Sequence, residues 1–147
     1  MLTTANESYL RDVLFNAFKT LNTFSGIEFI EEATADSCGN VSYPNKPFDK
    51  PEGTWFELAV LTDQPESVGL FKESQNRWTG FLQITLHVPL NAGTDQADNV
   101  YYWLNKLFAK GSEFAEVSIN GIYKASEQYE ADNYKTVFRV EFDADID

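Results

Sequence analysis

The residue types that carry most protein chemistry are scarce in this sequence. His87 is the only histidine and Cys38 the only cysteine. A serine or cysteine nucleophile needs a base beside it, yet Cys38 lies in a polar segment with no histidine or basic residue near it, and no serine stands in a nucleophile-elbow pattern. His87 falls on the polar phase of an alternating segment, so we expect a solvent-facing side chain. The sequence therefore predicts no catalytic residues and no enzyme.

Metal and nucleotide sites are not indicated either. Zinc needs clusters of cysteine and histidine, which one residue of each cannot supply. Asp143, Asp145 and Asp147 alternate, but they lack the glycine turn and distal glutamate of a calcium loop. The glycines are dispersed and form no phosphate-binding loop. We expect no metal and no cofactor, and we interpret residues 143–147 as an acidic tail that frays.

The composition indicates one globular domain over residues 1–147. The chain is 43% hydrophobic and 15% aromatic, which is enough for a packed core. It has no apolar run long enough for a transmembrane helix and no signal-peptide pattern, so we expect no membrane association. The net charge of −12 disfavours a surface that grips nucleic acid. That charge serves either solubility or a surface to which polyanions do not adhere.

Two segments have the pattern of amphipathic helices. The first begins at Thr4–Glu7, which has the form of a capping box, and ends at Gly26 after fading over Asn22–Ser25. The second runs from Thr94 or Asp95 to Ala109. The predicted core residues of the first are Leu10, Val13, Leu14, Ala17, Phe18 and Leu21; those of the second are Ala97, Val100, Tyr101, Leu104, Leu107 and Phe108.

Six segments have the composition or alternation of β-strands. Trp78–Val88 alternates apolar and polar residues with the period of a half-buried strand, and Trp55–Thr62 carries apolar residues on both faces, so we expect burial on both. The predicted strands are Ile27–Ala33, Trp55–Thr62, Trp78–Val88, Glu116–Ile119, Ile122–Gln128 and Tyr134–Phe142.

The connections between these segments determine the fold class. Asp63–Asn76 is predicted to be a long hairpin loop, and Asn120–Gly121 a two-residue turn. Consecutive strands without helices between them favour an antiparallel sheet. The sequence therefore predicts an α+β fold, with a mixed, mainly antiparallel sheet and two helices packed on one face.

Two further features concern the surface. Tyr43–Gly53 contains three prolines within eight residues, which predicts a stiff extended connector. Phe15 and Tyr102 project opposite the core faces of their helices, where monomeric domains normally carry polar residues. They are either scattered exposed aromatics, which are common, or residues buried against another subunit.

The order of elements and motifs resembles the tail terminator (tail completion) proteins of long-tailed bacteriophages and related prophage proteins. An amphipathic helix precedes a proline-rich connector and a strand that begins with tryptophan, and an Arg-x-x-Gly strand precedes a helix that ends in Leu-x-x-Leu-Phe. The matching positions are Pro44, Asn45, Pro47, Phe48, Pro51, Gly53, Trp55, Arg77, Gly80, Pro89, Gly93, Ala97, Leu104, Leu107 and Phe108.

The resemblance implies a structural protein that forms a hexameric ring on the tail tube, stops its polymerisation and offers the head-joining surface. Its implied partners are copies of itself, the tail tube protein and a head–tail connector protein. DNA would pass through the lumen without specific binding. The implied location is the virion tail, after assembly in the host cytoplasm. The candidate subunit-interface residues are Phe15, Tyr102, Pro47, Phe48, Val68, Leu70 and Phe71.

Two alternatives stay open from the sequence. One is a monomeric or dimeric module that binds a small ligand on its aromatic-rich sheet. The other is a different head–tail joining or tail-tube protein of similar fold.

Overall fold

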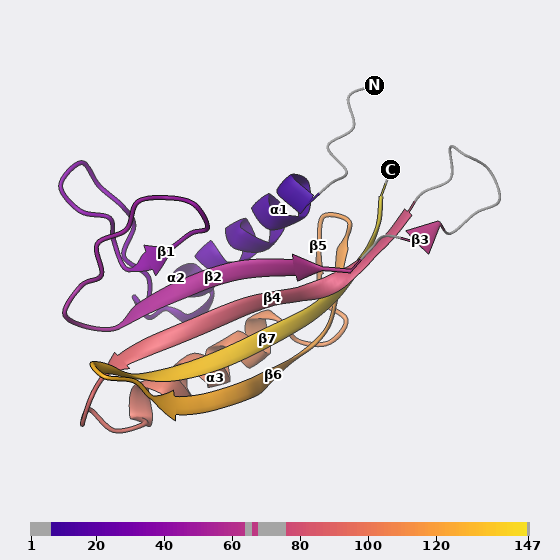
Figure 1. The fold of residues 1–147 in the computed structure, drawn as a ribbon. Coiled ribbons are helices and arrows are strands. Elements are labelled where there is room, and N and C mark those ends of the chain that lie inside the picture. Colours follow the sequence, from indigo (N-terminus) through magenta and orange to yellow (C-terminus); the bar gives the residue numbers. More distant parts are fainter. Residues whose placement is uncertain (1–6, 64–65, 68–75, 147) are drawn as a thin grey trace.

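Four long strands form the frame of the molecule (Figure 1). The computed structural model describes residues 7–63, 66–67 and 76–146. The long strands are β2 (Trp55–Thr62), β4 (Asn76–Pro89), β6 (Val117–Tyr129) and β7 (Asn133–Ile146). The short strands are β1 (Val41–Ser42), β3 (Glu66–Ser67) and β5 (Glu113–Phe114). The sheet has the order β1-β2-β4-β7-β6-β5, and β3 pairs with β4 beside this path. Only β1 and β2 pair in parallel, so the sheet is mixed and mainly antiparallel.

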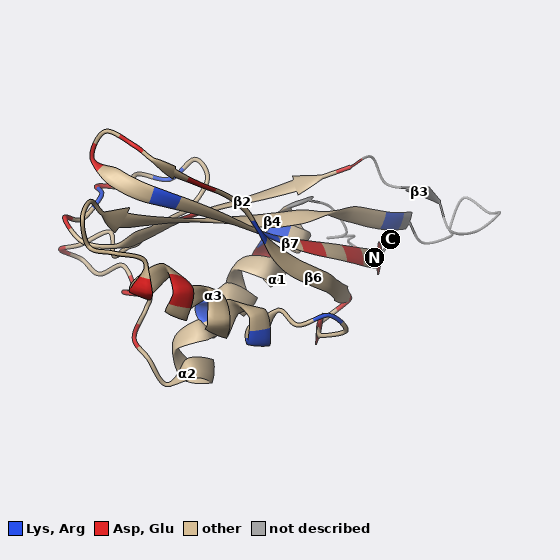
Figure 2. Ribbon diagram, turned by 90° about the horizontal axis from the view of Figure 1, so that it is seen from below, with Lys and Arg blue, Asp and Glu red and all other residues tan. Residues whose placement is uncertain are grey.

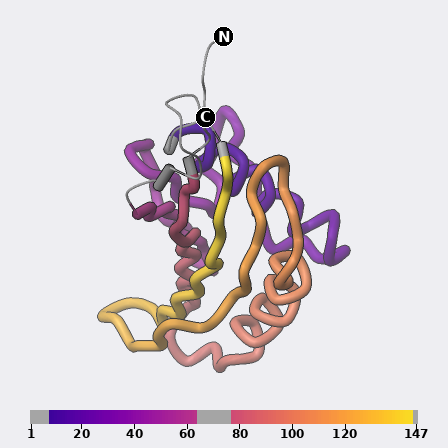
Figure 3. The backbone as a smooth tube through the Cα atoms, turned by 90° about the vertical axis from the view of Figure 1, so that its right-hand side faces the viewer, coloured from indigo at the N-terminus to yellow at the C-terminus, as the bar shows by residue number. Residues whose placement is uncertain are grey.

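The helices all lie on one side of this sheet. They are α1 (Glu7–Lys19), the short α2 (Leu21–Ser25) and α3 (Asp95–Leu107). Seen from below or from the end, the strands form one layer and the helices the other (Figures 2 and 3). The predicted α+β fold is confirmed.

The core fills the space between the helices and the inward face of the sheet. The predicted inward residues of both main helices and of β4 are buried, except Val13 and Tyr101, which are partly buried and pack against the core. Tyr101 packs flat against Phe138 with ring centroids 5.1 Å apart. On β2, Phe56 and Leu58 face this core, whereas Glu57 is exposed and Leu61 is 48% exposed. The expectation that β2 is buried on both faces was wrong, because no layer covers the outward face of the sheet.

The first helical region ends as predicted. Gly26 has a φ of 74°, in the left-handed region, and its N–H donates to the carbonyl of Asn22 at 2.8 Å. Glu7 begins α1, but the other residues of the predicted capping box lie outside the described residues.

The segment Ile27–Ala33 is not a strand, contrary to prediction. Two asparagine side chains take the place of a strand neighbour for its backbone. Asn22 accepts from the N–H of Ile30 at 2.9 Å and donates to its carbonyl at 2.7 Å. The buried Asn40 accepts from the N–H of Glu31 at 2.7 Å and donates to the carbonyl of Phe29 at 2.9 Å. These side chains satisfy the polar groups of an irregular segment, which composition alone does not reveal.

Asn120–Gly121 is not a turn either. β6 continues through both residues, and a bulge between Ile119 and Gly121 accommodates the extra residue. The residues before and after it cannot fold back on each other, because both pair with β7 along one ladder, Ile119 opposite Phe142 and Gly121 opposite Glu141. The two predicted strands Glu116–Ile119 and Ile122–Gln128 are therefore one.

The acidic C-terminal segment is part of the sheet up to Ile146, so the predicted fraying of residues 143–146 was wrong. Ala144 continues the inward phase of β7 and is only 1% exposed. The guanidinium of Arg77 donates to both carboxylate oxygens of its cross-strand neighbour Asp145, at 2.9 and 3.2 Å. This ion pair and the burial of Ala144 tie the end of β7 to β4; Asp147 lies outside the described residues.

Gly80 allows the close approach of β2 to β4. A Cβ atom at this position would lie 2.1 Å from the carbonyl oxygen of Leu61. Only glycine fits without moving one of the two strands. Most of the predicted loop Asp63–Asn76 lies outside the described residues; of the described part, Glu66–Ser67 forms β3 and Asn76 begins β4.

The Arg77–Asp145 pair makes stability sensitive to acid. The hydrogen bond from Arg77 lowers the pKa of Asp145 below its ordinary 3.8 in the folded state. A lowered pKa contributes stability above the unfolded value and loses that contribution as the pH falls through the folded value. We expect Asp145→Asn to lose less stability than the wild type between neutral pH and about pH 3. Urea unfolding at both pH values measures this; equal losses would contradict it.

Candidate interaction surfaces

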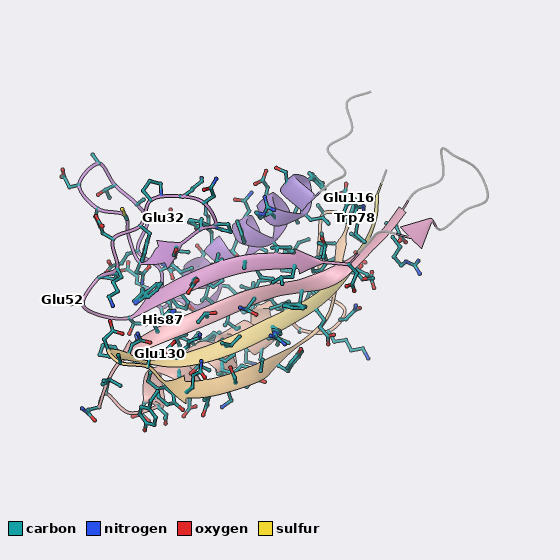
Figure 4. The ribbon with its side chains drawn as sticks, in the orientation of Figure 1. Glu32, Glu52, Trp78, His87, Glu116 and Glu130 are labelled. Atoms are coloured by element: carbon teal, nitrogen blue, oxygen red, sulfur yellow. The ribbon has the colours of Figure 1, made fainter. Side chains whose placement is uncertain are left out.

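His87 lies in an aromatic and polar cluster on the outward face of the sheet, at the end that also carries Glu52 and Glu130 (Figure 4). The imidazole is stacked on Trp55, with ring centroids 3.8 Å apart and planes 7° from parallel. Its Nε2 lies 3.2 Å from a carboxylate oxygen of Glu57, and its Nδ1 lies 3.0 Å from the amide oxygen of Asn133. Asn133 is held in place because its amide donates to Asp132 at 2.7 Å.

The predicted solvent exposure of His87 was therefore wrong. The side chain is 6% exposed even though no helix covers this face. The alternation of β4 gives the correct face but cannot show that Trp55 from β2 closes over the ring. The side chains that stack on the imidazole or hydrogen-bond to it are those of Trp55, Glu57 and Asn133.

The same cluster holds the proline-rich connector. The ring of Phe48 packs on Trp55 with centroids 5.2 Å apart, and Lys50 forms an ion pair with Asp132 in the β6–β7 turn. Pro47 is exposed beside them. The central part of the connector thus lies along its own sheet, and the part of Pro47 and Phe48 in a subunit interface stays a prediction.

The two aromatic residues expected on the solvent-facing sides of the helices, Tyr102 and Phe15, differ in burial. Tyr102 is 55% exposed, as predicted. Phe15 is only 8% exposed and belongs to the core, with its ring 5.4 Å from that of Tyr43. Its predicted solvent-side position was wrong, because Tyr43 of the connector packs over this side of α1. A helical projection shows only the helix and not the segments that pack on it. Val68, Leu70 and Phe71 lie outside the described residues.

Tyr102 is part of an exposed group of aromatic side chains that extends over α2 and α3. Phe24 is 48% exposed and meets Trp103 edge-on, with centroids 6.2 Å apart. Trp103 in turn meets Tyr102 at 5.2 Å, and the amine of Lys106 lies 5.0 Å from the Tyr102 ring centre. We call Phe24, Tyr102 and Trp103 the aromatic patch. Sequence reasoning missed Phe24 and Trp103. The helical pattern weakens over Asn22–Ser25, so it does not indicate that this segment forms α2 and packs on α3.

Metal sites and membrane-spanning helices are two further features that a chain of this kind could carry. Among the described residues, no group of three or more His, Cys, Asp or Glu side chains could hold a metal ion. No helix within the same part of the chain is both long and apolar enough to cross a membrane. The exposed aromatic patch is therefore the surface feature that most needs an explanation.

Comparison with known proteins identifies the class. Residues 27–137 match the family model described as phage tail terminator protein, and this match spans most of the chain. The chain belongs to the phage tail terminator family, as its resemblance implied, and is a structural component of a bacteriophage tail. The family is one of phage tail structural proteins.

The fold recurs in a solved structure of similar length. It aligns with 93% of this chain and 95% of its own, with a TM-score of 0.58 and 14% sequence identity. At this identity the similarity shows a shared fold alone. No curated protein matches the sequence.

Replacing Phe15 tests its place in the core. Phe15→Ser should lower the free energy of unfolding by about 3 kcal/mol, because it removes a buried ring and leaves a cavity beside Tyr43. Tyr102→Ser is the matched control and should change it by less than about 0.5 kcal/mol. Urea denaturation measures both; a Phe15→Ser variant as stable as the control would contradict the assignment.

Replacing Phe48 tests how the connector is held. Phe48→Ala removes the contact with Trp55, so we expect faster hydrogen exchange across residues 49–54 and unchanged exchange in β7. Pro47→Ala is the control, because Pro47 is exposed and Phe48 remains in place. Exchange followed by mass spectrometry distinguishes the two. Equal effects of both substitutions would show that the aromatic contact does not hold the connector.

Proposed function

We propose that the chain forms a closed homo-oligomeric ring, a hexamer, that caps the tail tube, stops its polymerisation and provides the head-joining surface. Membership of the tail terminator family supports the location at the tail end. The observation that carries ring formation is the aromatic patch. Phe24 and Tyr102 are about half exposed on the solvent side of α2 and α3, and both meet the partly buried Trp103; an isolated subunit gains nothing from exposing the two rings.

The chemistry of the patch suits a subunit contact. Tyrosine, tryptophan and phenylalanine are enriched at the centres of protein interfaces, and they lose little conformational freedom there. An interface between two different surfaces of the same chain closes into a ring when its rotation divides a full turn. Such a ring ends growth by itself, which is the property that a terminator requires.

The charge of the chain suits a passage for DNA. A net charge of −12 on each subunit repels phosphates, so DNA would pass the lumen without adhering. The partners in this proposal are the tail tube protein on one side of the ring and a head–tail connector protein on the other. Assembly takes place in the host cytoplasm before the ring becomes part of the virion.

Removing the patch tests this function. Phe24→Ser/Tyr102→Ser should shift the protein from ring to monomer, by at least about tenfold in the association constant, because it exchanges apolar contact area for hydroxyl groups. The matched control is Leu61→Ser, since Leu61 is also 48% exposed but lies on β2. Light scattering on size-exclusion peaks, with and without tail tube protein, measures the mass. A wild-type chain that stays monomeric under all conditions overturns the ring.

A further inference from the structure

Asn120 and Gly121 form the one asparagine–glycine pair of the sequence. They lie at the first bulge of β6, between Ile119 opposite Phe142 and Gly121 opposite Glu141. Asn120 therefore has no partner of its own on β7, because the bulge leaves the extra residue outside the ladder. The pair forms no turn, and the proposed ring makes no use of it.

A glycine that follows an asparagine opens the side-chain amide to attack by the chain itself. The backbone nitrogen of Gly121 and the Cγ atom of Asn120 can close a five-membered ring, and glycine has no Cβ atom to hinder the approach. Both groups belong to one chain, so the reaction needs no second protein molecule. Asparagine is accordingly one of the thermolabile residue types.

The surroundings of the pair leave room for this reaction. The side chain of Asn120 is exposed. Gly121 has a φ of 144°, which favours glycine, and outside its chain neighbours no heavy atom lies within 4 Å of where a Cβ atom would stand. From Gly121 onward, no described strand pairs with the outer side of β6. The bulge interrupts the ladder on the inner side, so the peptide groups here are held less firmly than in a regular strand.

We propose that Asn120 is a site of spontaneous deamidation, with water as the co-reactant. The nitrogen of Gly121 forms a bond to Cγ of Asn120, the bond from Cγ to Nδ2 breaks, and Nδ2 leaves as ammonia with the proton of the Gly121 N–H. Water then opens the resulting succinimide at one of its two carbonyl groups. One opening gives aspartate, and the other gives isoaspartate, in which the main chain runs through the former side chain. The inference does not depend on ring assembly.

Either product changes a contact between β6 and β7. The amide nitrogen of Asn120 donates to a carboxylate oxygen of Asp143 at 3.3 Å. Deamidation replaces this donor with a negative charge, so that two carboxylates face each other across the strands, which is unfavourable. Isoaspartate also adds one carbon atom to the backbone of β6 and disturbs its register with β7. The modification therefore loosens the last residues of β7, from Asp143 to Ile146.

Ageing of the intact protein tests the reaction. The folded wild type and a synthetic peptide of residues 117–124 are kept in mildly alkaline buffer, and peptide mass spectrometry follows the loss of the amide at Asn120. We expect the folded protein to react within about tenfold of the rate of the peptide, because little local opening is needed at the bulge. A slower loss than this would show that the fold protects Asn120, and would overturn the site.

Two controls identify the reacting group. Asn120→Gln keeps the amide but must close a less favourable six-membered ring, so its side chain should stay unchanged over the same time. Asn105 is exposed on α3 and precedes a lysine, and it should also keep its amide. Loss of either amide as fast as that of Asn120 would overturn the assignment to the asparagine–glycine pair.

A further variant tests the consequence for β7. Asn120→Asp supplies one product directly, and it should speed hydrogen exchange in residues 143–146 by about threefold or more, because the repulsion favours local opening. Asn105→Asp changes the net charge equally on α3 and should leave this exchange unchanged. Urea unfolding verifies that both variants fold. Equal exchange in Asn120→Asp and the wild type would overturn the loosening of β7.

Discussion

The pairing of β4 with β7 is the interaction on which the rest of the structure depends. The two strands run antiparallel in unbroken register from Asn76 opposite Ile146 to Pro89 opposite Asn133. Their inward side chains form the centre of the core, and β2 and β6 add to their outer sides. Because this ladder is central, the positions of α1 and α3 follow from which of its faces is apolar. A shift by one residue would turn Leu82, Ile84 and Phe138 outward, so the apolar pattern fixes the register.

Because all the helices lie on one side of the sheet, the second face is covered by side chains alone. The Trp55–His87 stack does so at one end, and farther along Arg139 lies 4.8 Å from the centre of the Phe81 ring and donates to Gln83 at 3.3 Å. These contacts bury Thr85, His87 and Val137 without a second layer. Flat rings and long polar side chains therefore cover part of the outward face, where Leu61 stays 48% exposed, and the helical side carries the aromatic patch. Because the two sides differ in this way, the candidate subunit contacts of the aromatic patch lie on the helical side.

The sequence predicts the parts of this fold that depend on local periodicity. The bounds of β2, the inward residues of β4 and the core faces of α1 and α3 all follow from spacing along one element. The failures all involve residues distant in sequence: Asn22 and Asn40 replace a strand neighbour for residues 29–31, and Tyr43 covers Phe15. For the candidate surface, periodicity predicts the exposure of Tyr102, whereas the aromatic patch requires knowing where α2 packs.

The outer edge of β6 affects how copies of the chain can associate at high local concentration. β5 pairs with β6 at Val117 and Ser118, and the backbone of Ile119 bonds to Gly111 and Ser112; within the described structure the rest of β6 has no strand neighbour on that side. Such an edge invites open-ended strand addition and fibrous aggregates. Two bulges in β6, at Asn120 and Ala125, interrupt the regular spacing of its peptide groups, and Lys124 and Glu127 place charges along it. These features disfavour open-ended β-strand addition between copies of the chain.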